Sequence, residues 1–145
     1  MVQLLKVENN KIKHIRLLYI LLSKRKYNIS HKKLPSYREH KKFVINSPYR
    51  VWYLIKNVNG FIGSTYISKE NIIGINAFDI HNDDYVKILK TLLNNHKPLK
   101  AIKSVRNSNF IINVNPSNKV LLECMNKIRT EQIQTSFLIK KNNLN

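Results

Sequence analysis

The chain has 145 residues, of which 43% are hydrophobic, and it carries a formal net charge of +18 at pH 7. This length and apolar content predict one folded domain over residues 1–145, and they argue against a disordered chain. The single cysteine, Cys124, excludes an internal disulfide, and no residue spacing suits a metal site. Every apolar run is too short to cross a bilayer, so we expect a soluble protein of the reducing cytoplasm that does not enter membranes.

The large positive charge has two interpretations. It predicts attraction to polyanions, as in a protein that binds nucleic acid or an acidic ligand. It also fits a chain rich in Lys, Asn and Ile throughout, in which lysines simply coat the surface. Between Lys24 and Lys42, basic residues alternate with aromatic ones in a pattern that could follow a phosphate backbone and stack bases. No known RNA-binding signature accompanies this pattern.

The first third of the chain predicts one strand and two helices. The strand covers residues 2–7, the helices cover residues 11–27 and 36–45, and a loop covers residues 28–35. Asn9 or Asn10 would cap the first helix. Ser36 followed three residues later by Glu39 is a capping-box pattern for the second helix.

Alternation with a period of two then replaces the helical pattern. Strands are predicted over residues 50–56 and 60–67, and the Asn-Gly step before the second strand is typical of a hairpin because both residue types tolerate positive φ. The same alternation places Trp52 and Tyr53 on opposite faces, so only one of them can line a cleft. A third strand is predicted over residues 72–80.

A polar break, His81-Asn82-Asp83-Asp84, joins that strand to an amphipathic helix, and Asp83 or Asp84 is the expected N-cap. A strand that leads into a helix N-terminus often forms an anion site, because free amides and the helix dipole point outward there. This loop, however, contains two acids and no glycine. Its sequence therefore opposes the anion site that its position favours.

The last third predicts a strand, a helix and a final strand. A basic connector over residues 98–107 leads to the strand over residues 110–114, and Ser117 or Asn118 would cap the helix that ends near Ile128. Residues 132–140 alternate well enough for the last strand, and residues 141–145 are expected to be a loose tail. The chain contains no internal repeat.

This order of elements resembles that of the GNAT N-acetyltransferase superfamily. The segments SYREHKKF and SPYRVWYLIKNVNGFIGSTYIS resemble the second helix and central hairpin of bacterial acetyltransferases that act on amino-sugar nucleotides. The segment NFIINVNPSNKVLLECMNKI resembles their fifth strand and the helix after it. The resemblance is clearest over residues 36–80 and 109–139. It implies an α/β (α+β) fold with a mixed, mostly antiparallel twisted sheet and helices on both faces.

The resemblance also implies a site for acetyl-CoA between the fourth and fifth strands, with a small amine as acceptor. The pantetheine arm would pair with the fourth strand, and the pyrophosphate would bind at the loop that starts with His81. Asn113 and Asn118 would face the thioester. The implied residues of the pantetheine edge are Ile75, Asn76, Ala77, Phe78 and Asp79.

Residues of the second helix and the hairpin would serve the acceptor. Glu39 or His40 is the candidate base that removes a proton from the amine, and Tyr37 and Tyr53 would contact the acceptor. The alternative for the first pair is a capping glutamate beside an exposed histidine.

The chain departs from the family pattern at three places. The family loop Gln/Arg-x-x-Gly-x-Gly/Ala is HNDDYV here, and Met125 stands where the family often has a tyrosine acid. Tyr85 would replace that acid only if its loop folds inward, and Arg129-Thr130 replaces a Gly-Phe step. Two functions therefore stay open. One is an acetyl-CoA-dependent N-acetyltransferase; the other is an inactive GNAT-fold protein that binds nucleic acid or a protein partner. Under either function the protein is expected to be a monomer or a homodimer.

Overall fold

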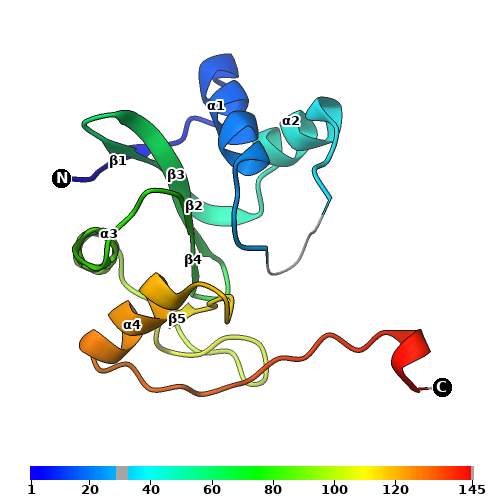
Figure 1. The fold of residues 1–145 in the computed structure, drawn as a ribbon, viewed down its shortest axis with the longest axis vertical. Coiled ribbons are helices and arrows are strands. Elements are labelled where there is room, and N and C mark those ends of the chain that lie inside the picture. The colour runs from blue at the N-terminus through cyan, green and yellow to red at the C-terminus, as the bar shows by residue number, and fades with distance from the viewer. Residues whose placement is uncertain (29–32, 145) are drawn as a thin grey trace.

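Five strands and four α-helices follow one another in a computed structural model that describes residues 1–28 and 33–144. The strands and helices follow one another in the order that the sequence predicts up to α4 (Figure 1). In chain order the elements are β1 Gln3–Lys6, α1 Ile12–Ser23, α2 Tyr37–Ile45, β2 Tyr49–Asn57, β3 Gly60–Ser68, β4 Ile72–Ala77, α3 Asn82–Asn95, β5 Ile111–Ile112, α4 Lys119–Lys127 and the 3₁₀ helix η1 Lys141–Leu144.

The strands form one sheet in the order β1-β2-β3-β4-β5. The first three pairings are antiparallel, and β4 pairs with β5 in parallel. The mixed, mostly antiparallel sheet expected from the sequence is thus confirmed. The helix α1 and its neighbour α2 lie on one side of this sheet and α3 lies on the other (Figure 1).

Alternation along the strands separates two cores. In β2, Val51 and Ile55 join a large core that α3 and α4 complete with Ile88 and Leu121. The intervening Leu54 joins a smaller core beneath α1 and α2, against which Trp52 packs. Trp52 and Tyr53 therefore face opposite sides of the sheet, as predicted. Burying both faces in this way supplies most of the stability, at about 1.5–3 kcal/mol for each fully buried large side chain.

The hairpin between β2 and β3 forms at the predicted place. Asn57 pairs with Gly60 across a two-residue loop, and only Gly60, with φ of 125°, adopts a positive φ. Asn59 instead donates its backbone N–H to Asn57 Oδ1 over 2.9 Å. Further along β3, Gly63 lets β4 approach closely, because a Cβ there would overlap the main chain of β4.

Two helix starts differ from the prediction. The N-caps of α1 and α3 are Lys11 and His81, and neither side chain makes a capping hydrogen bond. Asn9, Asn10 and the two aspartates were the expected caps. Asp83 and Asp84 instead lie in the first turn of α3, where carboxylates interact favourably with the positive end of the helix dipole. The helix α1 also ends at Ser23 rather than at residue 27.

The helices α2 and α4 begin as the sequence predicts. The capping box of α2 is complete: Glu39 N donates to Ser36 Oγ over 3.3 Å, and Ser36 N donates to Glu39 Oε2 over 2.8 Å. Asn118 caps α4 by accepting a hydrogen bond from Leu121 N over 3.2 Å.

The prediction of a C-terminal strand is wrong. Residues 132–140 are extended and exposed but pair with no strand of the described chain, so a sixth strand is absent there. Residues 141–144 form the 3₁₀ helix η1, so that the looseness of the tail stays a prediction, and Asn145 lies outside the described residues. His31 and Lys32, part of the predicted loop, also lie outside the described residues. None of the described helices has the length and apolar character needed to span a bilayer.

Candidate functional site

The strands β4 and β5 pair over only two residues and then separate. Ile72 and Ile73 pair with Ile111 and Ile112, and the rest of β4 has no neighbour on that side in the described sheet. Phe78 N donates to Ile62 O over 3.0 Å, which fixes the hydrogen-bonding phase of the regular β3–β4 ladder.

That phase decides which backbone groups are available at the open edge. In an antiparallel pair, alternate residues direct both N–H and C=O toward the partner strand. Asn76 and Phe78 therefore bond with β3, while the main-chain groups of Ile75 and Ala77 point away from it. On this side no strand of the described sheet pairs with these two residues, and an edge of this kind can bind an extended ligand as an additional strand.

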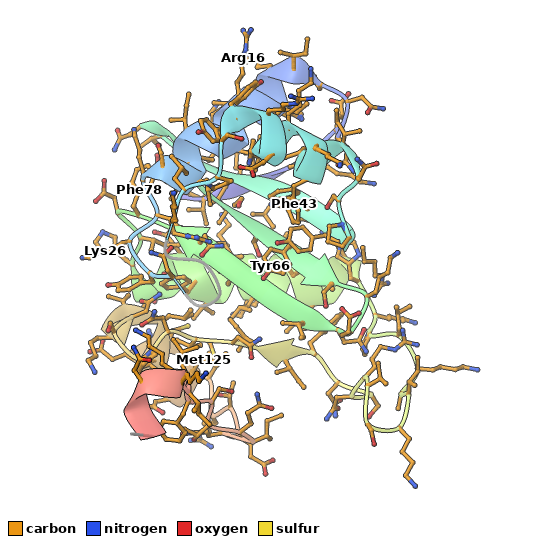
Figure 2. The ribbon with its side chains drawn as sticks, turned by 90° about the vertical axis from the view of Figure 1, so that its right-hand side faces the viewer. Arg16, Lys26, Phe43, Tyr66, Phe78 and Met125 are labelled. Atoms are coloured by element: carbon orange, nitrogen blue, oxygen red, sulfur yellow. The ribbon has the colours of Figure 1, made fainter. Side chains whose placement is uncertain are left out.

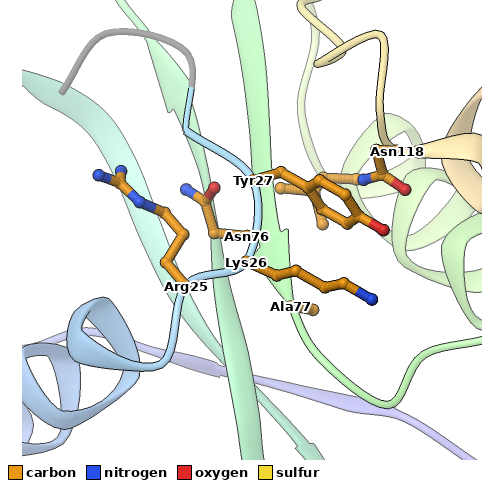
Figure 3. Close-up of a pocket in the computed structure, with 7 residues that line it drawn as sticks. Arg25, Lys26, Tyr27, Asn76, Ala77 and Asn118 are labelled. Atoms are coloured by element: carbon orange, nitrogen blue, oxygen red, sulfur yellow. The ribbon is translucent and has the colours of Figure 1, made fainter. Parts of the chain in front are cut away.

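A small pocket lies beside this edge (Figure 3). Its volume is about 10 Å³, enough for about one water molecule. The residues that line it are Arg25, Lys26, Tyr27, Ile75, Asn76, Ala77 and Asn118. Figure 3 shows Tyr27 extending from the segment after α1 across β4 toward Asn118, whereas Arg25 projects to the other side of that segment.

The segment after α1 is tied to the far side of the pocket. Asn115, in the turn between β5 and α4, donates from Nδ2 to the carbonyl oxygen of Asn28 over 2.8 Å. The same side chain accepts a hydrogen bond from Ser117 N over 2.9 Å, which holds the turn itself. Residues 25–28 therefore cross the opening between β4 and the turn, and they account for the small volume of the pocket.

Asn118 is held in place by two contacts. It is only 5% exposed, and besides capping α4 it donates from Nδ2 to the hydroxyl of Tyr85 over 3.3 Å. Tyr85 is 1% exposed, and burial raises the pKa of its hydroxyl. The side chain of Tyr85 thus turns inward, behind Asn118, and joins α3 to α4 rather than lining the pocket itself.

The start of α3 carries both acids of the HNDDYV loop. Asp83 pairs with Lys127 of α4 at 3.0 Å, and the two side chains are 90% and 61% exposed. Asn82 Nδ2 donates to Glu123 Oε2 over 3.4 Å in the same region. Because an exposed ion pair is weak, it draws Asp83 toward α4 without removing the negative charge near the first-turn amides. His81 is exposed at the N-cap and does not line the pocket.

The structure places Glu39 and His40 in structural positions. Hydrogen bonds from Ser36 lower the pKa of Glu39, as expected for a capping carboxylate. The expectation of an exposed histidine is wrong, because His40 is only 4% exposed. Its Nε2 lies 3.0 Å from the carbonyl oxygen of Ile15. A carbonyl only accepts, so Nε2 carries the proton. Neither residue lines the pocket, and their role as base stays a prediction.

The remaining predicted residues are dispersed. Tyr37 packs edge-to-face on Tyr19 with ring centroids 5.3 Å apart. The hydroxyl of Tyr53 lies 2.8 Å from His96 Nε2 on the α3 side of the sheet. Asn113 is exposed beyond β5. Asp79 follows β4 with a left-handed φ of 49°, so the predicted pantetheine edge ends at Ala77.

The pocket nevertheless brings together Ile75, Asn76, Ala77 and Asn118, four of the eight predicted cofactor residues. Sequence reasoning missed Tyr27 and its two basic neighbours as lining residues, because it extended α1 through residue 27. No group of three or more His, Cys, Asp or Glu side chains among residues 1–28 and 33–144 is placed to hold a metal ion.

Comparison with known proteins rests on the structure, because neither a family model nor a curated protein matches the sequence. A GNAT-family acetyltransferase of Streptococcus pneumoniae superposes with a TM-score of 0.56 at 11% identity, covering 97% of this chain and 99% of that one. A predicted acetyltransferase of Clostridium acetobutylicum, solved with acetyl-CoA, gives a TM-score of 0.56 at 13% identity, with 99% and 98% covered. The chain has the GNAT fold. Identities this low establish the GNAT architecture and leave the chemistry to be argued from the site.

Proposed function

We propose that this protein is an N-acetyltransferase that transfers the acetyl group of acetyl-CoA to a small amine. The observation that carries the proposal is the open edge of β4 in a GNAT fold, where Ile75 and Ala77 direct main-chain groups away from β3 into the space that β5 leaves. Those groups suit the amides of a pantetheine arm, which pairs as a strand does. Lys26 and Arg25 beside the edge would attract its phosphates.

The reaction requires little from the side chains beyond orientation. The amine nitrogen attacks the carbonyl carbon of the thioester, a C–N bond forms, the C–S bond breaks, and the departing thiolate takes a proton while the amine loses one. Backbone N–H donors at the strand edge would stabilise the oxygen as it gains charge. Asn118, held rigidly by Tyr85 and by its capping bond, would orient the reacting groups. With Glu39 and His40 outside the pocket, deprotonation through water is the simplest route.

An amino-sugar nucleotide is the acceptor class that we favour. The face of the sheet toward α1 and α2 carries a stack of Tyr49 on Tyr66, with ring centroids 3.8 Å apart and planes within 5° (Figure 2 labels Tyr66). Arg25 lies near both rings. A flat base and a charged phosphate chain are the groups that aromatic and guanidinium surfaces bind well.

The small volume of the pocket favours a second function. In this case the protein is an inactive GNAT-fold module that binds a nucleic acid or a protein partner. About 10 Å³ beside β4 does not admit an acetyl group unless residues 25–28 move. The two acids at the start of α3 would also repel a pyrophosphate.

Calorimetric titration with acetyl-CoA separates these functions. The decisive variant is Ala77→Pro, which removes an N–H that points away from β3 and therefore leaves the sheet ladder intact. Ala77→Gly keeps that N–H and is the matched control. We expect wild-type and A77G protein to bind acetyl-CoA saturably in the micromolar range and A77P to lose at least tenfold in affinity.

Dephospho-CoA and a short RNA serve as controls for plain charge attraction at raised salt. Saturable binding that survives the salt and depends on Ala77 supports the enzyme and justifies a screen of amines. Equal, salt-sensitive binding of all three polyanions, or no binding, contradicts it and supports the binding module.

A further inference from the structure

The connection between α3 and β5 contains a projecting segment, residues 97–106, which we call the basic knob. Its sequence, KPLKAIKSVR, has four cations, no acid and no Phe, Tyr or Trp. Figure 2 shows the connection projecting beyond the sheet, on the side away from the labelled Lys26. None of the residues that line the pocket beside β4 belongs to the knob, so its role is separate from the proposed acetyl transfer.

The knob is a folded turn. The carbonyl oxygen of Ile102 accepts hydrogen bonds from Val105 N over 2.9 Å and from Arg106 N over 2.8 Å, and Ile102 N donates to Arg106 O over 2.9 Å. Ser104, within this turn, adopts a left-handed φ of 61°. At the base, the buried side chain of Asn71 bonds to two points of the connection. The cations of the knob therefore project from a backbone of fixed shape, which loses less freedom on binding than a loose loop would.

Two arginine side chains join the knob to the sheet and keep their charge. Arg106 donates from Nη1 to the carbonyl oxygen of Lys69 over 3.0 Å and from Nε to that of Lys100 over 2.6 Å. Arg50 of β2 donates from Nη1 to the carbonyl oxygen of Lys97 over 2.8 Å. Carbonyl oxygens carry no formal charge, so these bonds position the guanidinium groups without neutralising them. The set that gathers here, which we call the basic cluster, is Arg50, Lys69, Lys97, Lys100, Lys103 and Arg106.

No ion pair neutralises the basic cluster. The two ion pairs formed within residues 1–28 and 33–144 involve none of its members. Glu70, which follows Lys69, is exposed and forms no ion pair among these residues. The lysines of the cluster are all exposed as well. Six cations with one neighbouring acid thus form a strongly positive surface of fixed shape, and such a surface concentrates polyanions next to it.

We propose that the basic cluster binds double-stranded DNA through the phosphate backbone. A duplex offers regularly spaced phosphates, and each cation that contacts one releases a condensed counterion, which drives association. A single strand is bound largely by stacking of its bases on aromatic side chains, and the knob has no Phe, Tyr or Trp. Phosphate contacts do not distinguish bases, so we expect binding without sequence preference.

The shape of the knob favours DNA over an RNA duplex. The major groove of B-DNA is wide enough to admit a protein element, whereas that of an RNA duplex is deep and narrow. A closed turn the size of residues 102–106 can enter the DNA groove, and the cations around it then reach the phosphates that border the groove.

An anionic membrane suits the knob less well. The large apolar side chains exposed on it are Ile102 and Val105, at 46% and 63%. Segments that dock on lipid bury a broad apolar face, rich in Trp, Phe and Leu, alongside their cations. Two β-branched side chains do not form such a face.

The first test is the fluorescence anisotropy of a short labelled DNA duplex of mixed sequence, titrated with the full chain. The variant K97Q/K100Q/K103Q removes three charges from the cluster and keeps the main-chain carbonyls that Arg50 and Arg106 bind. At about 0.1 M salt we expect this variant to bind about tenfold more weakly than the wild type, because it loses three phosphate contacts.

The matched control is R38Q/K41Q/K42Q, which removes three charges from exposed positions of α2. We expect its affinity to stay within about twofold of the wild type, since these cations lie outside the cluster. Salt dependence gives a second readout. Each lost phosphate contact lowers the slope of log K against log salt by about 0.9, so the slope should fall by about 2–3 in the knob variant and by less than about 1 in the control.

Residue-resolved NMR locates the contact. On addition of the duplex, the amide signals of residues 97–106 should shift in the wild type, whereas those of α2 should not. Amide signals of β2 and β3 that are the same in the knob variant as in the wild type show that the sheet is intact.

Equal losses of affinity in the two triple variants would overturn the proposal, because net charge alone would then explain the binding. A larger loss in the α2 variant would overturn it as well and place the DNA on that helix. Single-stranded DNA, an RNA duplex and vesicles of anionic phospholipid serve as competitors. If any of them displaces the labelled duplex at a lower phosphate concentration than unlabelled duplex DNA does, the surface has another partner and the proposal fails. Absence of duplex binding overturns it too, and leaves the proposed acetyl transfer untouched.

Discussion

At the scale of single residues, Asn71 fixes the position of the long connection between α3 and β5. It is fully buried and has a left-handed φ of 63°. Its Nδ2 donates to the carbonyl oxygens of Leu99 and Asn107, and its Oδ1 accepts from Leu99 N, each over 2.8 Å. One side chain thus replaces a strand partner for two points of a connection that would otherwise be loose.

Replacing Asn71 should be among the most destabilising changes in the chain. Asn71→Ala removes three partly buried hydrogen bonds to the main chain of Leu99 and Asn107 and retains the left-handed backbone, so we expect a loss of about 3–5 kcal/mol in the free energy of unfolding. Asn71→Gly loses the same bonds but adopts positive φ freely, and it should retain about 1 kcal/mol more. Urea unfolding of the two variants separates the loss of the hydrogen bonds from the cost of the left-handed backbone. A loss below about 1 kcal/mol for N71A would show that water replaces the bonds.

His40 should make stability depend on pH. Burial lowers its pKa, so the folded protein resists protonation while the unfolded chain titrates near 6.5. Below that pH the unfolded state binds more protons, and the free energy of unfolding falls as the pH decreases. His40→Gln keeps a donor for Ile15 O and should lessen this dependence.

The measurement is the urea midpoint between pH 7.5 and pH 5.0 for the wild type and H40Q. An equal fall in both proteins would assign the pH effect to other groups. His14 is the first to consider, because burial lowers its pKa as well and its Nδ1 accepts from Glu8 N over 3.0 Å.

Residues whose roles are local could be predicted, and those with distant partners could not. The capping box of Ser36 and Glu39 spans three positions, so the sequence contains all of it. Asn118 as the cap of α4 is local in the same sense. Asn71 and Tyr27 act on segments far along the chain, and nothing in their neighbourhood indicates those partners.

At the scale of elements, the start of α3 decides how strongly an anion binds beside β4. Its first-turn amides and dipole favour a phosphate, while Asp83 and Asp84 oppose one. Asparagine preserves the size of both side chains and removes both charges. If the proposed site binds acetyl-CoA, D83N/D84N should bind it several-fold more tightly, and the gain should shrink as salt screens the charges.

Calorimetry at low and moderate salt checks this prediction. The matched control is Glu70→Gln, which removes one acid that lies outside the pocket and α3. An equal gain in E70Q would reflect net charge alone. No gain in D83N/D84N, while the wild type still binds acetyl-CoA, would place the phosphates away from α3.

Most elements could be predicted because each shows its own period, and the exceptions have a physical reason. The helices α1 and α2 bury one face against the sheet, and the strands β2, β3 and β4 direct alternate side chains toward the cores, so their patterns show in the sequence. Residues 132–140 carry a strand pattern as clear as several of these, yet they form no strand because a strand exists only with a partner. Such a pattern predicts the tendency to pair and leaves the partner unspecified.

At the scale of the whole molecule, charge is poorly balanced. The sequence has 26 Lys and Arg residues against 8 Asp and Glu residues. In the part of the chain that the structure describes, only two ion pairs form, Lys11 with Glu8 and Lys127 with Asp83. Most cations therefore repel one another across the surface, and this repulsion disfavours the compact state.

Salt should stabilise the protein for that reason. The Debye length falls from about 30 Å at 0.01 M to about 8 Å at 0.15 M salt, so we expect the urea midpoint to rise with NaCl and most of the rise to occur below about 0.15 M. Pyrophosphate at matched ionic strength provides the comparison. A larger rise with pyrophosphate than with NaCl means that the protein holds the anion at a site, because screening depends on ionic strength alone. A midpoint that does not change with NaCl would contradict the repulsion, and the excess charge would then have no influence on the folded state.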